Sequence, residues 1–171
     1  GVDLSISPFE LTEARAMIEG EAAALAAVMI TNEQLGELEL ALSEMADESA
    51  VVYENADKKF HAIISRATGN KMMETVIDNL WFVRDSSPTV RRAYQSICET
   101  DGDLRLSEHT EIFEALKNRK DSLARKAMHQ HFSRIINRLI AAEEKEQVET
   151  IQRKMIESRK RFSLNHLISS K

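Results

Sequence analysis

Residues that break helices are scarce in this sequence. Its 171 residues include only five glycines and two prolines, whereas average usage would give about 20 of the two types together. A β-sandwich or a β-barrel needs turn residues throughout its length. Long helices therefore fit this sequence best, and at this length we expect one domain, with or without a tail.

Charge, cysteine content and hydropathy exclude several classes of protein. The 23 basic and 28 acidic residues give a formal net charge of −5, so the sequence is a poor match for a polyanion-binding protein. One cysteine, Cys98, cannot form an internal disulfide. The longest apolar run, Ala22–Ile30, is shorter than the roughly 18 residues of a membrane span. We expect a cytoplasmic protein with no membrane segment, and, because the sequence begins at Gly1 rather than at Met, part of a longer chain.

Capping signals and apolar periodicity predict six or seven helices between residues 7 and 142. Ser7 and Glu10 form a capping box around Pro8, which is favoured at the first helical position. Further helices are predicted at about 31–46, 50–67, 70–86 and 89–97, around 106–116, and from residue 121 onward. From residue 143 charges of both signs dominate, and we interpret 143–171 as a solvated helical extension or a frayed tail. The predicted fold is an all-α bundle.

Four polar side chains fall on faces that the apolar pattern turns inward. Asp57 and His61 lie one helical turn apart, so they leave the same face of their predicted helix. His109 and His131 each lie on the apolar stripe of another helix. His129 is rotated by about 200° from His131 and is expected to face solvent. One carboxylate and three imidazoles in a helical core form a ligand set suited to zinc, nickel, iron or manganese.

Each of these four residues also has an ordinary structural explanation. A single inward histidine is more often a hydrogen-bonded core residue than a metal ligand. Asp57 and His61 can form an intrahelical ion pair worth about 0.3–0.5 kcal/mol. The four together are harder to explain in this way, since a buried polar group without a partner costs about 1–3 kcal/mol. Both interpretations stay open on helical phase alone.

Two arginines and a tryptophan also lie inside predicted helices. Arg15 falls on the inward stripe of the first helix, and Arg84 follows Trp81 on the fourth. A buried guanidinium needs an anion, and its planar fork matches a carboxylate. That anion is either an internal carboxylate or a small organic acid bound beside the metal. The internal candidates are Glu19, Glu21 and Asp57. Trp81 is either the floor of such a pocket or ordinary core together with Phe60, Phe82 and Phe113.

These residues resemble the FadR C-terminal (FCD) domain, the effector-binding half of one large branch of GntR-family bacterial transcription regulators. The resemblance covers about residues 8–140, and its pieces are specific in combination although each is weak alone. The matching pieces include Glu13-Ala14-Arg15, Asp57-Lys58-Lys59-Phe60-His61, Thr68-Gly69-Asn70, Glu108-His109 and His131. The last two histidines are separated by 22 positions, as in the family's pattern.

The resemblance implies an antiparallel bundle of six or seven helices, which in many members holds a divalent metal, often zinc. Carried over residue by residue, its ligands are Asp57, His61, His109 and His131. Arg15 matches the first-helix arginine that meets the effector carboxylate in similar proteins. Members typically form dimers and bind operator DNA through an N-terminal winged helix-turn-helix, which is absent from this sequence. Residues 7–15 and 80–88 look most like regulators that respond to hexuronates or related sugar acids, and residues 143–171 have no counterpart in the pattern.

The sequence therefore predicts the effector-sensing and dimerisation domain of a metabolite-responsive transcription regulator, not an enzyme. In this prediction a small carboxylate binds the metal and Arg15, with Arg84 and Trp81 beside it. One alternative is a metal-dependent hydrolase or another metalloenzyme. It needs a general base, and helical phase turns Glu108 away from His109 by about 100°. A second alternative is a helical dimerisation module with a structural metal.

Overall fold

The computed structural model describes residues 6–46, 49–98 and 102–168, and within these ranges the chain is helical without any strand. This confirms the predicted all-α fold. The helices are α1 (Pro8–Met29), α2 (Asn32–Met45), α3 (Ala50–Ala67), α4 (Lys71–Ser86), α5 (Pro88–Cys98), α6 (Gly102–Lys117), α7 (Asp121–Arg161) and α8 (Asn165–Ile168). The chain divides into two compact units, Gly1–Leu139 and Ile140–Lys171.

Local signals in the sequence set the ends of the first helices. Ser7 and Glu10 close the predicted capping box at the start of α1, with the Glu10 amide donating to the Ser7 hydroxyl at 3.1 Å. Thr31 and Gln34 form a second capping box at the start of α2. Gly69 follows α3 with a φ of 65°, a left-handed conformation that glycine adopts without steric cost. Each cap satisfies backbone groups that the end of a helix leaves unpaired.

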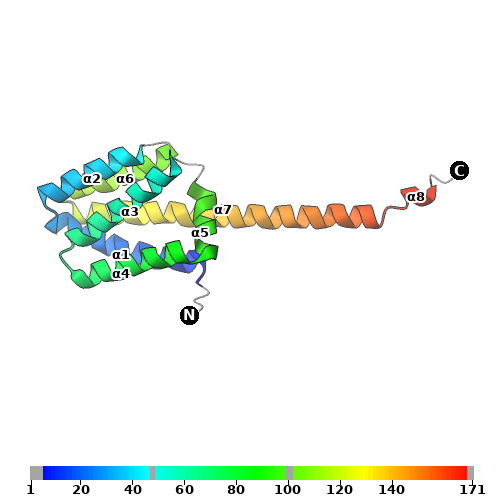
Figure 1. The fold of residues 1–171 in the computed structure, drawn as a ribbon, viewed down its shortest axis with the longest axis horizontal. Helices are drawn as coiled ribbons and strands as arrows, with labels where there is room; N and C mark the ends of the chain where they lie inside the picture. Colours follow the sequence, from blue (N-terminus) through cyan, green and yellow to red (C-terminus); the bar gives the residue numbers. More distant parts are fainter. Residues whose placement is uncertain (1–5, 47–48, 99–101, 169–171) are drawn as a thin grey trace. The chain divides into compact units, whose positions relative to one another are not determined.

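The first unit is a bundle in which α1 contacts most of the other helices (Figure 1). Helix α1 packs against α3, α4, α5 and α6, while α2 packs against α3 and α6. Alanines make this close approach possible, and Ala22, Ala23, Ala26 and Ala27 have no exposed surface. Helix α5 lies across one end of the bundle (Figure 1) and contacts α1 and α4. The core therefore surrounds α1 and is covered at one end by α5.

Aromatic side chains fill part of this core, with one exception to the prediction. Phe60, Trp81 and Phe113 are buried. Phe82 was expected in the core but is 66% exposed. It lies one position after Trp81 on α4, so it is rotated by about 100° from the inward face of that helix.

The second unit consists of the end of α7 and the short helix α8. No glycine or proline follows Gly102 in the sequence, so nothing in the composition interrupts α7 before Arg161. Apolar side chains on this unit are exposed: Val148, Ile151, Met155, Ile156, Phe162, Leu164, Leu167 and Ile168. Among the residues placed by the structure, no helix has the length and hydropathy to cross a membrane.

Candidate metal centre and anion pocket

Three helices bring the four predicted ligands together inside the first unit. Asp57 and His61 come from α3, His109 from α6 and His131 from α7. One possible ligand atom of each residue lies within 4.8 Å of those of the other three. The three histidines are buried, and the Asp57 side chain is 14% exposed. One ion can therefore contact side chains from three helices at this point.

Each histidine of this cluster has its Nδ1 atom next to a hydrogen-bond acceptor. The three Nδ1–acceptor pairs are His61 with Glu19 Oε2 at 2.5 Å, His109 with the Arg105 carbonyl oxygen at 2.7 Å, and His131 with Glu108 Oε2 at 2.9 Å. Carboxylate and carbonyl oxygens only accept hydrogen bonds, so each Nδ1 carries a proton and donates it. The Nε2 atoms are thus the ones available as ligands, an arrangement common to metal-binding histidines.

The charges of the cluster depend on burial and on these partners. Burial opposes ionisation of Asp57, but the hydrogen bond with His109 and the close contact with His61 outweigh it and hold the pKa of Asp57 well below its usual range. Burial also disfavours the charged form of His61, yet the charge of Glu19 and the adjacent Asp57 carboxylate raise its pKa to about 9. For His131, burial and the neighbouring histidines lower the pKa well below the usual value.

The donor set fits a divalent transition metal. Three imidazole nitrogens and one carboxylate oxygen are ligands that zinc, nickel, iron and manganese accept. His61 Nε2 is buried and has no hydrogen-bond partner, which is costly unless something else contacts it. Asp57 Oδ1 lies 2.8 Å from His109 Nε2 and 3.5 Å from His61 Nε2. Asp57, His61, His109 and His131 would hold the ion.

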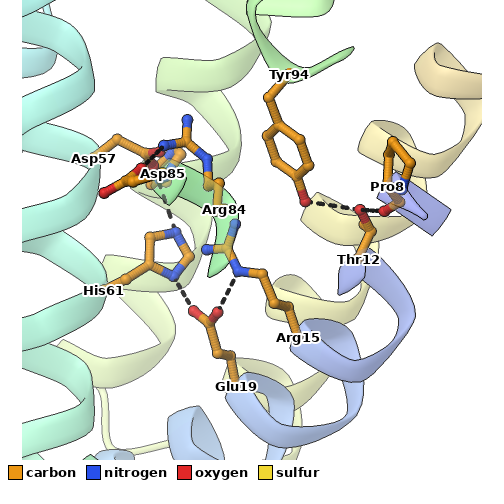
Figure 2. Close-up of polar contacts among 10 residues, drawn as sticks. Pro8, Thr12, Arg15, Glu19, Asp57, His61, Arg84, Asp85 and Tyr94 are labelled. Carbon is orange, nitrogen blue, oxygen red and sulfur yellow. Dashed lines mark hydrogen bonds and ion pairs between the residues drawn. The ribbon is translucent and has the colours of Figure 1, made fainter. Parts of the chain in front are cut away.

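A buried carboxylate connects this cluster to Arg15 (Figure 2). Glu19 accepts a hydrogen bond from Arg15 Nε at 2.7 Å with one oxygen and contacts His61 with the other. Burial opposes the charge of Glu19, but Arg15 and His61 lower its pKa to about 2. Glu19 is thus the internal partner of Arg15. Because this bond uses Nε, the two Nη atoms of Arg15 remain for another acceptor.

Arg84 and Arg15 both stack on Trp81. The central carbon of the guanidinium lies 4.2 Å from the centre of the Trp81 ring for Arg15 and 4.8 Å for Arg84. Arg84 Nη1 donates to Asp85 at 3.1 Å, as Figure 2 shows. Lys58 contacts the other oxygen of Asp85 at 2.7 Å. Stacking on a large aromatic face holds both cations in place.

Two adjacent cavities lie next to the metal cluster. The inner one, about 20 Å³, is lined by Arg15, Tyr53, Asp57, Arg84, Tyr94, Ile97, Arg105, His131, Arg134 and Ile135. The outer one, about 270 Å³, is lined by residues of α3, α4 and α5 and shares Arg84 and Tyr94 with the inner cavity. Trp81 lines neither cavity, and its ring packs against the guanidinium groups of Arg15 and Arg84. A larger groove of about 700 Å³ along α6 and α7 contains none of the predicted site residues.

Sequence reasoning missed several residues of the site. Glu108 was expected to point away from His109, and it does. Its side chain points toward α7. There it contacts His131, and its Oε1 accepts from Arg134 Nε at 2.6 Å. Tyr53 and Arg105 lie one helical turn before Asp57 and His109. A search one turn away from each predicted ligand would have found them.

The family of the chain follows from a match over most of its length. The sequence model of the FCD domain family matches residues 10–134, a range that contains all four candidate ligands and both predicted arginines. The chain belongs to the FCD domain family.

Individual relatives agree with this assignment. The chain is 30% identical over 125 residues to the Exu regulon transcriptional regulator of Escherichia coli, covering 72% of this chain and 48% of the relative. It is also 30% identical over 140 residues to the Uxu operon transcriptional regulator of Escherichia coli, covering 78% of this chain and 54% of the relative. The chain thus spans about half the length of the relatives it matches, and these relatives are transcription regulators rather than enzymes.

A solved structure has the same fold. The Escherichia coli protein McbR/YncC superposes with a TM-score of 0.68 at 20% sequence identity, covering 78% of this chain and 64% of the other. At this identity the likeness establishes the helical bundle alone.

Proposed function

We propose that this chain is the effector-sensing part of a transcription regulator and that it binds a small carboxylate, a sugar acid, at a divalent metal. One observation carries the proposal. Three buried histidines have their Nδ1 atoms fixed by acceptors, so their Nε2 atoms are left to join Asp57 beside a cavity lined by Arg15. Ordinary core histidines do not need this arrangement.

The residues around the metal have separate tasks in this proposal. Asp57, His61, His109 and His131 hold the ion, for which zinc is the first candidate and nickel, iron or manganese are the alternatives. When bound, the ion supplies a positive charge that a carboxylate oxygen can contact. The Nη atoms of Arg15 bind the same carboxylate, which suits the planar fork of a guanidinium. Glu19 keeps Arg15 and His61 in place.

Sensing requires more than tight binding. An effector shifts a conformational equilibrium only if it binds one state better than the other, with a coupling of about 1–3 kcal/mol in typical cases. We propose that the chain acts as a homodimer and that operator DNA is bound by an N-terminal winged helix-turn-helix outside this sequence. The likeness to the regulators of the Exu regulon and the Uxu operon supports both the regulatory role and a hexuronate-like effector.

Metal content provides the first test of the proposal. After loading with zinc and dialysis, elemental analysis should find one ion per chain in the wild type and almost none in His109→Ala. His129→Ala is the matched control, because His129 lies two residues from His131 but outside the cluster. It should retain its ion. A wild type without bound metal contradicts the proposed site.

Effector binding provides the second test. Calorimetry of the zinc-loaded protein with D-galacturonate and D-glucuronate should show stoichiometric binding without turnover. Arg15→Lys keeps a positive charge beside Glu19 but loses the planar fork, so it should weaken binding by about tenfold or more. Turnover of the acid would instead favour the metalloenzyme. Binding of metal with no response to any sugar acid would leave only a structural role for the ion.

A further inference from the structure

The inner cavity contains more positive charge than its carboxylates balance. Its lining includes the side chains of Arg15, Arg84, Arg105 and Arg134. Three of them have a carboxylate close by: Arg15 contacts Glu19 at 2.7 Å, Arg134 contacts Glu108 at 2.6 Å, and Arg84 contacts Asp85 at 3.1 Å. Asp57 belongs to the candidate metal site, where it would face a doubly charged ion. Arg105, and Arg84 with its shared carboxylate, determine what else the cavity can hold.

Arg84 and Arg105 present buried donors that no residue described by the structure accepts. Arg105 stacks on Tyr53 at 3.9 Å, and both its Nε and Nη1 are buried without a hydrogen-bond partner. Arg84 is 8% exposed, and its Nε is also buried without a partner. The carboxylate that Arg84 does contact, Asp85, is shared with Lys58. Buried guanidinium donors are normally paired with an anion.

We infer that the effector carries a second acidic group, which Arg84 and Arg105 bind while the first carboxylate binds the metal and Arg15. This inference rests on the proposed function and narrows its ligand class. A hexuronate has one carboxylate and cannot neutralise both ends of the pocket. A sugar diacid, with a carboxylate at each end of the carbon chain, can.

The sizes and positions of the two cavities agree with an elongated ligand. The inner cavity of about 20 Å³ holds about one water molecule, so an acid of six carbons cannot fit in it alone. Arg84 and Tyr94 separate it from the outer cavity of about 270 Å³. Tyr94 is held by one hydrogen bond, 2.7 Å from Thr12 on α1 (Figure 2). When the side chains of Arg84 and Tyr94 move, the two cavities join. Arg84 then lies beside the far end of the ligand.

Matched pairs of acids test the inference directly. D-Galactarate and D-galacturonate share their carbon chain and hydroxyl configuration but differ in one terminal carboxylate, and so do D-glucarate and D-glucuronate. Calorimetry of the zinc-loaded full chain should show at least one diacid bound about tenfold or more tightly than its matched uronate. Zinc content measured after each titration separates binding from removal of the ion by the diacid.

Variants assign the preference to the two arginines. Arg105→Gln should reduce the preference to less than about threefold, because a neutral amide no longer attracts the second carboxylate. Arg84→Gln should reduce the preference in the same way. Arg92→Gln is the control, since Arg92 is an exposed arginine of α5 that lines neither cavity. It should retain the full preference.

The outcomes separate this inference from the proposed function. Equal affinity of the wild type for uronate and diacid overturns the inference and leaves the proposed function intact. Zinc loss to the diacid without a bound complex overturns it too. A preference that survives in both Arg84→Gln and Arg105→Gln overturns the assignment of the second group to these residues. Failure of all four acids to bind the zinc-loaded protein overturns both the inference and the sugar-acid sensor. Comparison of the acids on the wild type does not depend on whether the variants fold.

Discussion

At the scale of single residues, Glu19 connects the two halves of the site. One oxygen contacts Arg15 and the other contacts His61, and the Glu19 side chain is almost fully buried. A change at the metal can therefore reach Arg15 through one side chain, and a change at Arg15 can reach the metal. His61 also lies near Asp57, but at the longer distance of 3.5 Å.

Glu19→Gln should weaken both folding and metal binding. The amide still accepts hydrogen bonds but carries no charge, so Arg15 is left buried beside a neutral group. Loss of one partner of a buried ion pair typically costs about 3–5 kcal/mol, and the retained acceptor places the expected loss at the lower end. Zinc affinity should fall by about 10–100-fold, as for other outer partners of ligating histidines. Urea unfolding and competition with a chelator measure the two effects.

Glu21→Gln is the control for this variant. Glu21 lies on the same helix and pairs with Arg125, but both side chains are exposed, and exposed ion pairs contribute little. Glu21→Gln should change neither the free energy of unfolding nor the zinc affinity appreciably. Equal effects of the two substitutions would show that Glu19 has no special connection to the metal.

His61 makes metal binding depend on pH. Its pKa is raised to about 9 in the metal-free protein, so at pH 7 it is protonated and must lose a proton before Nε2 can bind an ion. The raised pKa stabilises the metal-free fold fully below the ordinary value of about 6.5, and this contribution is lost as the pH rises through about 9. Zinc affinity should therefore rise from pH 7 toward pH 9, with about one proton released by His61 on binding. Calorimetry at pH 7 in buffers of different ionisation enthalpy counts the protons, and a count of zero would contradict the prediction.

At the scale of helices, local patterns predict much of this fold but not the partners of its side chains. The caps at Ser7 and Thr31 and the break at Pro88 depend on neighbours in sequence, so they were predictable. The inward phase of His61 was predictable for the same reason. The contact of His61 with Glu19 depends on how α1 packs against α3, and helical phase within one helix does not contain that information. For the same reason the role of Glu108, which faces α7, was not predictable.

Helix α1 contains a glycine where another helix approaches closely. A Cβ atom built on Gly20 would lie 2.2 Å from His129 Nε2 and 2.5 Å from its Cδ2, so the ring would have to move. Alanine is otherwise favoured over glycine within a helix by about 0.5–1 kcal/mol. Gly20→Ala should therefore give little or no stabilisation in the wild type but about 0.5–1 kcal/mol in the His129→Ala background. Urea unfolding of the four proteins in this double-mutant cycle measures the coupling, and an equal gain in both backgrounds would contradict it.

At the scale of the whole molecule, the candidate site and its supporting residues belong to one of the two compact units. The family match covers residues 10–134 and the first unit ends at Leu139. All four candidate ligands precede that residue, and so do the acceptors of the three histidine Nδ1 atoms. We propose that residues 7–142 form the metal- and effector-binding domain and that 143–171 form a separate charged extension.

A chain that stops after Ala142 should keep the properties of the first unit. It retains His131 and the apolar residues Ile135 and Leu139, which are buried, so the bundle loses no core side chain. We expect one zinc ion per chain and a thermal midpoint within about 4 °C of the full chain, the shift that roughly 1 kcal/mol causes in a domain of this size. A chain that stops after Gln130 is the control, because it lacks His131 and the core residues that follow, and it should bind no zinc. Loss of zinc or of cooperative melting in the longer truncation would mean that residues 143–171 stabilise the bundle, and the proposed boundary would then be wrong.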